Sequence, residues 1–180
     1  QRSEFGYRDI TPAPLVHNFC LQPYVDCRAS INSFIPVDLT DDCALRLVNI
    51  YLDILMENPR LHDKLELDVV FTIWTPTYKE DVKQRFKDRN VTELDIIELE
   101  QALKKITVNA LLRLDDDTSS LNALKERFEL LTKAALEPID KIYQLIEDCK
   151  KFGTLAFSHA ARAGFVAVTL LKSFVKAGYL

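Results

Sequence analysis

The chain has 180 residues, of which 48% are hydrophobic and 28% charged, with a net charge of -4 and a pI of about 5.4. This length predicts one folded domain with a hydrophobic core, and the low count of 4 Gly and 7 Pro excludes a low-complexity chain. Basic residues are scattered, which argues against a nucleic-acid partner. We count no apolar run of membrane-spanning length and no secretory signal, and we therefore expect a cytoplasmic protein with no membrane contact.

The cysteines predict a reduced, intracellular protein without a metal site. None of them forms a C-x-x-C pair, and no histidine stands at zinc-ligand spacing from any of them. They are Cys20, Cys27, Cys43 and Cys149. The sequence begins at Gln1 without a methionine and ends just after the helix-stopping Gly178. We expect residues 1–180 to be a single domain excised from a longer chain.

The stretch at residues 24–35 alternates between apolar and polar side chains, which is the pattern of a strand that sends alternate residues to opposite faces. Its apolar positions are Val25, Cys27, Ala29, Ile31 and Ile35, and its polar positions include Asp26, Arg28, Ser30 and Asn32. Pro36 ends the run, as expected for a residue that cannot donate to a ladder. A row of short hydrogen-bonding groups with one guanidinium is typical of a binding surface, and a plain polar sheet face is the alternative.

A second alternating stretch predicts a partner strand at residues 65–74. Its apolar face carries Leu65, Leu67, Val69, Phe71 and Ile73. If the two strands pair, we expect Arg28 within cross-strand reach of Glu66 or Asp68. Lys64 would likewise reach Asp26. The polar face is either a charged pocket floor or a set of exposed ion pairs, each worth well under about 1 kcal/mol.

The rest of the chain is predicted to be helical. Thr40 caps a helix that ends before Asn58-Pro59, a charged helix follows Tyr78, and Thr92-x-x-Asp95 resembles a capping box that opens the next helix. Beyond residue 120 the apolar spacing predicts helices to Gly153, with Pro138 either kinking one or starting a new one, and a last helix at about residues 158–176. We expect a predominantly helical α+β fold, with a small sheet that includes strands near residues 24–35 and 65–74 packed against four to five helices.

Two short motifs have a functional and a structural interpretation. Asp115, Asp116 and Asp117 are predicted to lie in a solvated loop, because adjacent acids cannot all face one ion and the D-x-D-x-D-G spacing is missing. Ser158-His159-Ala160-Ala161 resembles the T-S-H-A-A motif of phosphohistidine domains. The glycines that precede that motif are absent here, so we favour a helix start with a helical His159.

Four segments together resemble the central region of bacterial multidomain proteins of the phosphoenolpyruvate synthase and pyruvate phosphate dikinase type. They are Phe5-Gly6-Tyr7-Arg8, residues 23–36 (PYVDCRASINSFIP), residues 61–71 (LHDKLELDVVF) and residues 161–167 (ARAGFVA). The group includes the glutamine kinase of capsule phosphoramidate synthesis. The resemblance implies a parent enzyme that moves phosphate from ATP, with Mg2+, through a histidine to a small acceptor such as glutamine. It also implies an ATP-grasp domain and a phosphohistidine domain elsewhere in the parent chain, and no cofactor in this segment.

Two functions of different class follow. In the first, the segment is the acceptor-binding domain of a phosphotransferase, inactive by itself. Its predicted substrate-binding residues are Asp26, Arg28, Ser30, Asn32, Ser33 and Lys64, and its predicted catalytic residues are His62 and Glu66. Arg28 would pair with a carboxylate or phosphate, Asn32 would bind an amide, and Glu66 or His62 would orient the nucleophile or take its proton. In the second, the segment is a non-catalytic helical interaction or scaffolding domain.

Overall fold

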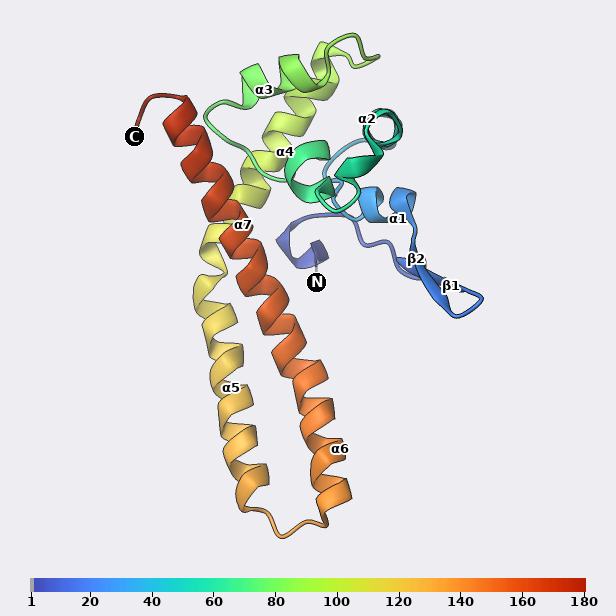
Figure 1. The fold of residues 1–180 in the computed structure, drawn as a ribbon. Helices are drawn as coiled ribbons and strands as arrows, with labels where there is room; N and C mark the ends of the chain where they lie inside the picture. The colour runs from blue at the N-terminus through green and yellow to red at the C-terminus, as the bar shows by residue number, and fades with distance from the viewer. Residues whose placement is uncertain (1) are drawn as a thin grey trace. The chain divides into compact units, whose positions relative to one another are not determined.

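The computed structural model describes residues 2–180, with residues 114–118 and 120 described by their backbone only. The predominantly helical α+β class is confirmed, and within the described chain the structure has seven α-helices and one small antiparallel sheet (Figure 1). The helices are α1 (Cys27–Asn32), α2 (Asp41–Glu57), α3 (Tyr78–Arg85), α4 (Glu93–Leu112), α5 (Leu114–Lys133), α6 (Pro138–Asp148) and α7 (Thr154–Lys176). The strands are β1 (Val16–Phe19) and β2 (Gln22–Val25).

Four shorter helical turns connect these elements. They are the 3-10 turns η1 (Arg2–Phe5) and η2 (Pro59–Leu61) and the π-helical turns η3 (Leu65–Val69) and η4 (Cys149–Gly153). Backbone contacts divide the described chain into two units. One is Ala110–Ala167, and the other combines Arg2–Asn109 with Val168–Leu180.

Helix α2 forms the centre of the larger unit's core. Thr40 caps it as predicted, because its side chain accepts a hydrogen bond from the Cys43 backbone N–H, and Asn58 ends it. The apolar residues of α2 recur at helical spacing and so share one face. This face is almost completely buried, which removes its apolar surface from water. That face includes Cys43, Ala44, Leu47, Val48, Tyr51 and Ile54, and it packs with Ile31, Phe34, Val69, Val70, Phe71, Leu99 and Leu103.

The predicted capping box at the start of α4 is confirmed. The Thr92 backbone N–H donates to Asp95 Oδ2 at 3.0 Å, and the Asp95 backbone N–H donates to Thr92 Oγ1 at 3.1 Å. Two N–H groups that the first turn leaves without helical partners are thereby satisfied. Asp95 also accepts two hydrogen bonds from Arg46, at 3.0 and 2.6 Å, which ties α4 to α2.

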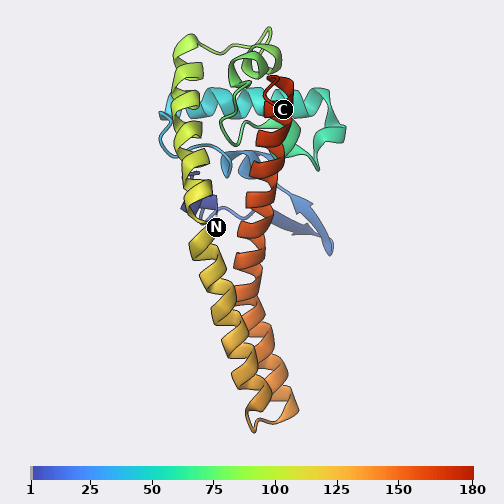
Figure 2. The same cartoon turned by 90° about the vertical axis from the view of Figure 1, so that its left-hand side faces the viewer.

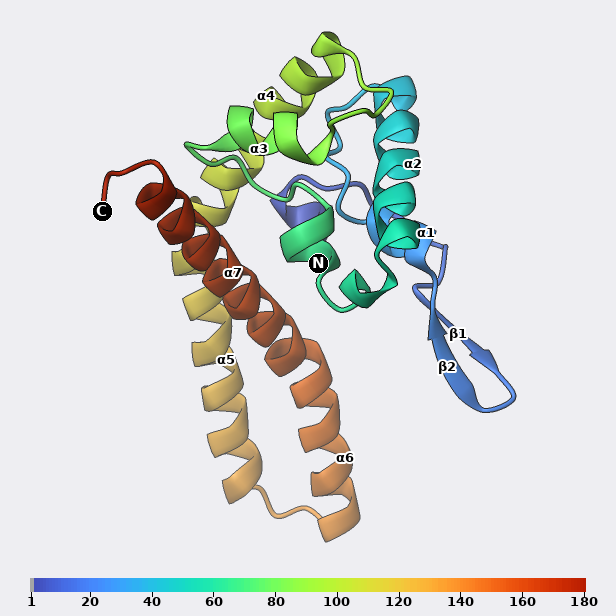
Figure 3. The same cartoon turned by 45° about the horizontal axis from the view of Figure 1, so that its top comes forward.

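A β-hairpin precedes α1 and was not foreseen from the sequence (Figure 3). β1 and β2 pair antiparallel in a register that sets Val16 opposite Val25 and Phe19 opposite Gln22. The two turn residues, Cys20 and Leu21, have φ values of 50° and 65°. Such a left-handed two-residue turn matches the twist of a hairpin, although Asn and Gly adopt it at lower cost than Cys and Leu do.

The predicted strand at residues 24–35 is wrong beyond Val25, because α1 begins at Cys27. The Asp26 side chain accepts a hydrogen bond from the Ala29 backbone N–H at 2.8 Å and so caps this short helix. Ile31, Phe34 and Ile35 are then all buried, and their spacing of three and four residues is helical. The alternating apolar and polar residues therefore run from β2 into the start of α1, and the buried residues come later in the sequence.

The predicted strand at residues 65–74 is also wrong. Residues 65–69 form the π-helical turn η3, and the following residues are irregular and buried. Without a neighbouring strand, two backbone N–H groups of the irregular part are satisfied by hydroxyls of surrounding side chains. Phe71 N–H donates to Tyr51 Oη at 3.4 Å, and Trp74 N–H donates to Thr107 Oγ1 at 2.9 Å.

In the smaller unit, α5 and α6 are antiparallel neighbours joined by residues 134–137 (Figure 2). Pro138 stands in the first turn of α6, as one of the two predicted alternatives had it. The prediction that the helix ends at Gly153 is wrong, because η4 carries the chain into α7 without a break. An ion pair at 2.7 Å between Arg127 and the buried Asp148 links α5 and α6.

The predicted loop at residues 115–120 is wrong for the backbone, which is helical as part of α5. The side chains of Asp115, Asp116 and Asp117 lie outside the described residues. His159 is helical as predicted, but the predicted helix start at Ser158 is wrong, because α7 already begins at Thr154. His159 is 3% exposed, and its Nδ1 lies 3.3 Å from an Arg113 guanidinium nitrogen.

Candidate functional site

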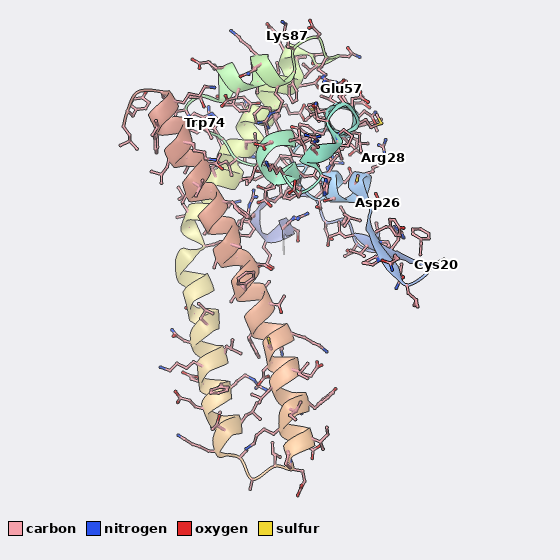
Figure 4. All side chains as sticks on the ribbon, viewed as in Figure 1. Cys20, Asp26, Arg28, Glu57, Trp74 and Lys87 are labelled. Carbon is pink, nitrogen blue, oxygen red and sulfur yellow. The ribbon has the colours of Figure 1, made fainter. Side chains whose placement is uncertain are left out.

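A polar cavity of about 380 Å³ lies in the larger unit, where the N-terminal segment meets the start of α1. Its lining residues are Arg8, Asp9, Ile10, Ala13, Asp26, Arg28, Ala29 and Asn32. Figure 4 labels Asp26 and Arg28 at the point where β2 leads into α1. Four of the eight lining residues carry charge, two of each sign, and a fifth carries a carboxamide.

The N-terminal segment forms one wall of this cavity and is fixed by backbone contacts. The Arg8 backbone N–H donates to Ile35 O at 2.8 Å, next to a β-bridge between Tyr7 and Pro36. The Arg8 guanidinium donates to Leu39 O at 2.7 Å and pairs with Asp41 at 2.9 Å. These contacts hold Arg8 in place. They thereby form a cavity wall from a segment that is distant in the sequence from Asp26 on the other wall.

Asp9 carries the negative charge on the same wall. Its Oδ1 accepts a hydrogen bond from the Thr11 backbone N–H at 2.9 Å. This bond to the ionised form, with a further contribution from the Thr11 side chain, lowers the pKa of Asp9 below its ordinary value. Asp9 is therefore a carboxylate at neutral pH.

The first turns of α1 form the other wall. Asp26 is held by its capping bond to Ala29 and by His17, whose Nε2 lies 3.6 Å from Asp26 Oδ2. Arg28 is exposed, and its guanidinium donates to the neutral Asn49 Oδ1 at 3.2 Å. Arg28 and Asn32 are four residues apart on a helix, so they share one face. The cavity lining contains both of them.

The arrangement fits a small ligand that carries charges of both signs or an amide. A guanidinium presents a fixed fork of donors to a carboxylate or a phosphoryl group. A carboxylate accepts hydrogen bonds from an ammonium group, and a carboxamide offers one acceptor and two donors. All three types of group line this one cavity, at Arg8 and Arg28, Asp9 and Asp26, and Asn32.

Of the eight predicted site residues, three line this cavity: Asp26, Arg28 and Asn32. They meet because a helical turn brings them together, and the strand face on which they were predicted to lie does not exist. Ser30 and Ser33 face the interior instead, with exposed fractions of 9% and 4%. The Ser33 hydroxyl donates to Ser30 O at 2.6 Å and also accepts a hydrogen bond from the Arg2 side chain.

His62, Lys64 and Glu66 do not line the cavity. His62 is exposed at the end of η2, with its Nδ1 3.1 Å from Pro59 O. Lys64 precedes η3, and Glu66 lies within it.

The predicted cross-strand ion pairs of Arg28 and Asp26 are wrong, because the second strand is missing. Arg28 binds Asn49, and Asp26 pairs with His17. The structure thus brings the first predicted cluster together and leaves the second outside the cavity.

Sequence reasoning missed the contribution of Arg8 and Asp9. Both stand in a proline-containing segment without periodicity, and Asp26 lies 17 positions after Asp9. The bridge between Tyr7 and Pro36 and the backbone bond from Arg8 to Ile35, both formed in the tertiary structure, fold this segment back toward α1. The Tyr7-Arg8-Asp9 cluster of polar side chains was the one local signal available.

Among the described residues, no three His, Cys, Asp or Glu side chains are grouped so that they could hold a metal ion. Contrary to the expectation that no apolar run reaches membrane-spanning length, the helical run Pro138–Lys176 contains a window long and apolar enough, by length and composition alone, to cross a membrane. Core helices of soluble proteins meet the same criterion, so this window assigns no location.

Comparison of the chain with protein-family models, with curated proteins and with solved structures finds no match.

Proposed function

We propose that this chain is the acceptor-binding domain of an ATP-dependent phosphotransferase of the phosphoenolpyruvate synthase type. The acceptor is a small amino acid or amide, such as glutamine. The observation that carries the proposal is the convergence of Arg8, Asp9, Asp26, Arg28 and Asn32 on one cavity of about 380 Å³. Its charges of both signs complement a zwitterion, and its carboxamide complements an amide.

Arg28 is the anchor in this proposal. Within the described chain its one recorded hydrogen bond goes to the neutral Asn49, and it has no ion-pair partner there. An exposed guanidinium with a neutral partner keeps its donors available for an anionic group, and a charge-assisted bidentate contact is roughly twice as strong as a neutral one. Asn32 lies one turn further along α1 and is placed to bind the amide of the same ligand.

The parent enzyme supplies the rest of the reaction. Its ATP-grasp domain binds ATP and Mg2+, and its phosphohistidine domain carries the phosphoryl group to the acceptor. The acceptor's nucleophilic atom forms the new bond to phosphorus and loses a proton, while the histidine is regenerated. The chain described here binds and orients the acceptor, works in the cytoplasm, and is inactive by itself.

A titration with L-glutamine tests this proposal. We expect glutamine to shift the backbone amide resonances of the cavity residues in the 180-residue chain. Arg28→Lys should weaken that binding about tenfold or more, because lysine keeps the charge and loses the fork. Arg60→Lys is the matched control, since Arg60 is an exposed arginine of η2 outside the cavity, and it should leave the binding unchanged.

Thermal unfolding separates a binding role from a structural one. We expect the same Tm for the native chain and for Arg28→Lys, because Arg28 is exposed and makes a single hydrogen bond. Unchanged glutamine affinity together with a lowered Tm would make Arg28 a structural residue. Absence of any shift at cavity residues up to saturating glutamine would reject an amide acceptor.

A second candidate function, a helical interaction or scaffolding domain, is favoured by the apolar surface of α6. Ile139, Ile142, Tyr143 and Ile146 are 72%, 53%, 62% and 49% exposed and follow helical spacing. The same unit has an apolar groove lined by residues of α5 and α6, among them Leu121, Phe128 and Leu145. If this function holds, glutamine shifts no resonance, whereas Ile142→Glu reduces the fluorescence of an apolar-surface dye without lowering the Tm.

A further inference from the structure

The two edges of the β-hairpin differ in their hydrogen-bonding groups. The Asp26 backbone N–H donates to Leu15 O at 2.9 Å, just beyond the paired residues Val16 and Val25. Hydrogen-bonded and non-hydrogen-bonded pairs alternate along an antiparallel ladder. His17 with Tyr24 and Phe19 with Gln22 are therefore the hydrogen-bonded pairs.

The backbone groups of the remaining pairs point away from the ladder. On the β1 edge these belong to Val16 and Asn18, and on the β2 edge to Pro23 and Val25. Both edges lie in exposed chain, since seven of the eight strand residues are exposed. What distinguishes the edges is which groups they can offer to another strand.

The β2 edge is blocked. Pro23 has no N–H to donate, and proline on an edge strand is a common means of preventing further pairing. The outward carbonyl of Val25 accepts a hydrogen bond from Cys27 Sγ at 3.9 Å. No second strand can add here with a regular ladder.

The β1 edge is open. Val16 and Asn18 present an N–H and a C=O each, two residues apart, which is the spacing that a further strand requires. Within the described chain no backbone hydrogen bond is recorded to these outward groups. Residues 15–25 contain no Lys, Arg, Asp or Glu, so the charges that usually protect an exposed edge are missing.

We infer that the β1 edge is a strand-addition site, and that its occupant is β1 of a second copy of this chain. The product is a four-stranded antiparallel sheet with β2 at both outer edges. A two-fold axis at His17 sets Val16 opposite Asn18 of the other copy, so that the outward groups of both strands bond to each other. Two-fold pairing of this kind uses the same surface twice and closes at a dimer.

The side chains support a second copy as the occupant. The register centred on His17 places Leu15 beside Phe19 of the other copy on one face of the sheet. These residues are 38% and 60% exposed in the single chain, so both gain apolar contact. Because residues 15–25 contain no Lys, Arg, Asp or Glu, the pairing brings no such charges of like sign together.

The same pairing would also stabilise the hairpin, which has only two strands. A two-stranded hairpin is marginally stable in water, and three or more strands with an apolar face are needed for independent stability. Val16, Phe19, Tyr24 and Val25 are each more than half exposed. Addition of a second hairpin doubles the strands and covers part of this apolar surface.

Sedimentation equilibrium of the 180-residue chain between about 1 µM and about 1 mM tests the inference over the range of weak association. We expect a monomer–dimer equilibrium. Asn18→Pro removes an outward N–H of β1 and no hydrogen bond within the hairpin, because Asn18 and Pro23 form a non-hydrogen-bonded pair. It should weaken the dimer at least tenfold. Val25→Pro is the matched control on the opposite edge and should leave the dimer intact.

Hydrogen exchange of the native chain gives an independent readout that requires no variant. The amide protons of Val16 and Asn18 should become more protected as the concentration rises, while those of the β2 edge should not. A chain that stays monomeric to about 1 mM overturns the inference. So does equal weakening by Asn18→Pro and Val25→Pro, or a dimer that Asn18→Pro leaves unchanged.

Discussion

Asp95 is expected to be one of the most sensitive polar residues of the larger unit. It is 2% exposed, completes the capping box with Thr92, and accepts two hydrogen bonds from Arg46. The Arg46 guanidinium is the main reason why the pKa of Asp95 lies far below its ordinary value. Asp95 therefore joins the start of α4 to the middle of α2.

The cost of Asp95→Asn follows from the atoms involved. Oδ2 of Asp95 accepts from both Thr92 N–H and Arg46 Nε, while Oδ1 accepts from Arg46 at 2.6 Å. Asparagine keeps one oxygen, so its NH2 group would face a guanidinium donor at the Oδ1 position. Arg46 is 38% exposed and can turn to solvent, which leaves a buried amide incompletely bonded and costs about 2 kcal/mol. Asp95→Ala also loses the cap, for about 3 kcal/mol in all.

Urea unfolding followed by circular dichroism measures this cost, and pH identifies its origin. A carboxyl with a depressed folded-state pKa stabilises the fold above its unfolded pKa of about 3.9, and that stability is lost as the pH falls toward the folded value. The native chain should therefore exceed Asp95→Asn by about 2 kcal/mol at pH 7. The difference should shrink as the pH falls below about 4.

Asp38→Asn provides the comparison. Asp38 pairs with Lys105 at 2.9 Å, but both side chains are about half exposed or more, so this pair should contribute less than about 0.5 kcal/mol. Two results would refute the reasoning. One is equal destabilisation by Asp38→Asn and Asp95→Asn, and the other is a difference between the native chain and Asp95→Asn that does not change with pH.

Two further predictions concern buried groups of the same unit. Ser173→Ala should lower the free energy of unfolding in urea by about 1–3 kcal/mol, because Ser173 Oγ accepts the Thr77 backbone N–H at 3.1 Å and both residues are buried. Ser173→Thr, which keeps the hydroxyl, should cost less, and equal losses would argue against the hydrogen bond. Burial, followed by the hydrogen bond to Asp95, raises the pKa of Cys43 to about 12. Iodoacetamide at pH 8 should therefore spare Cys43, by mass spectrometry, while it labels the exposed cysteines Cys20, Cys27 and Cys149. Rapid native labelling of Cys43 would show that its thiol is not buried.

Local sequence signals predicted both ends of α2 and the start of α4 correctly, whereas they missed α1 and the starts of α5 and α7. Thr40, Asn58 and the pair Thr92 and Asp95 act within one turn of themselves, so their roles do not depend on distant residues. Pro138 likewise starts a helix because its missing N–H is not needed in the first turn. The predominantly helical class followed from these caps together with the apolar spacing between them.

The candidate site was predictable only in part. Asp26, Arg28 and Asn32 were selected for their chemistry, and they do line one cavity, although on a helix and not on a strand. Arg8 and Asp9 belong to the opposite wall, and nothing near them in the sequence indicates what they face. His62, Lys64 and Glu66 were joined to the site only through a strand pairing that does not form.

The sequence by itself determined the helical class, the caps and the polar residues of α1, because each depends on neighbours within about four positions. The tertiary structure decided which secondary structure the two alternating stretches adopt. At residues 27–35 the burial of Ile31, Phe34 and Ile35 against α2 favoured the helical period over the strand period. At residues 70–77 the hydroxyls of Tyr51, Thr107 and Ser173 supply the hydrogen bonds that a neighbouring strand would have given. The alternation did not show which side chains leave water, since Val25 and Leu67 of the predicted apolar faces are exposed. Burial and the partners of the backbone are fixed only when distant segments meet.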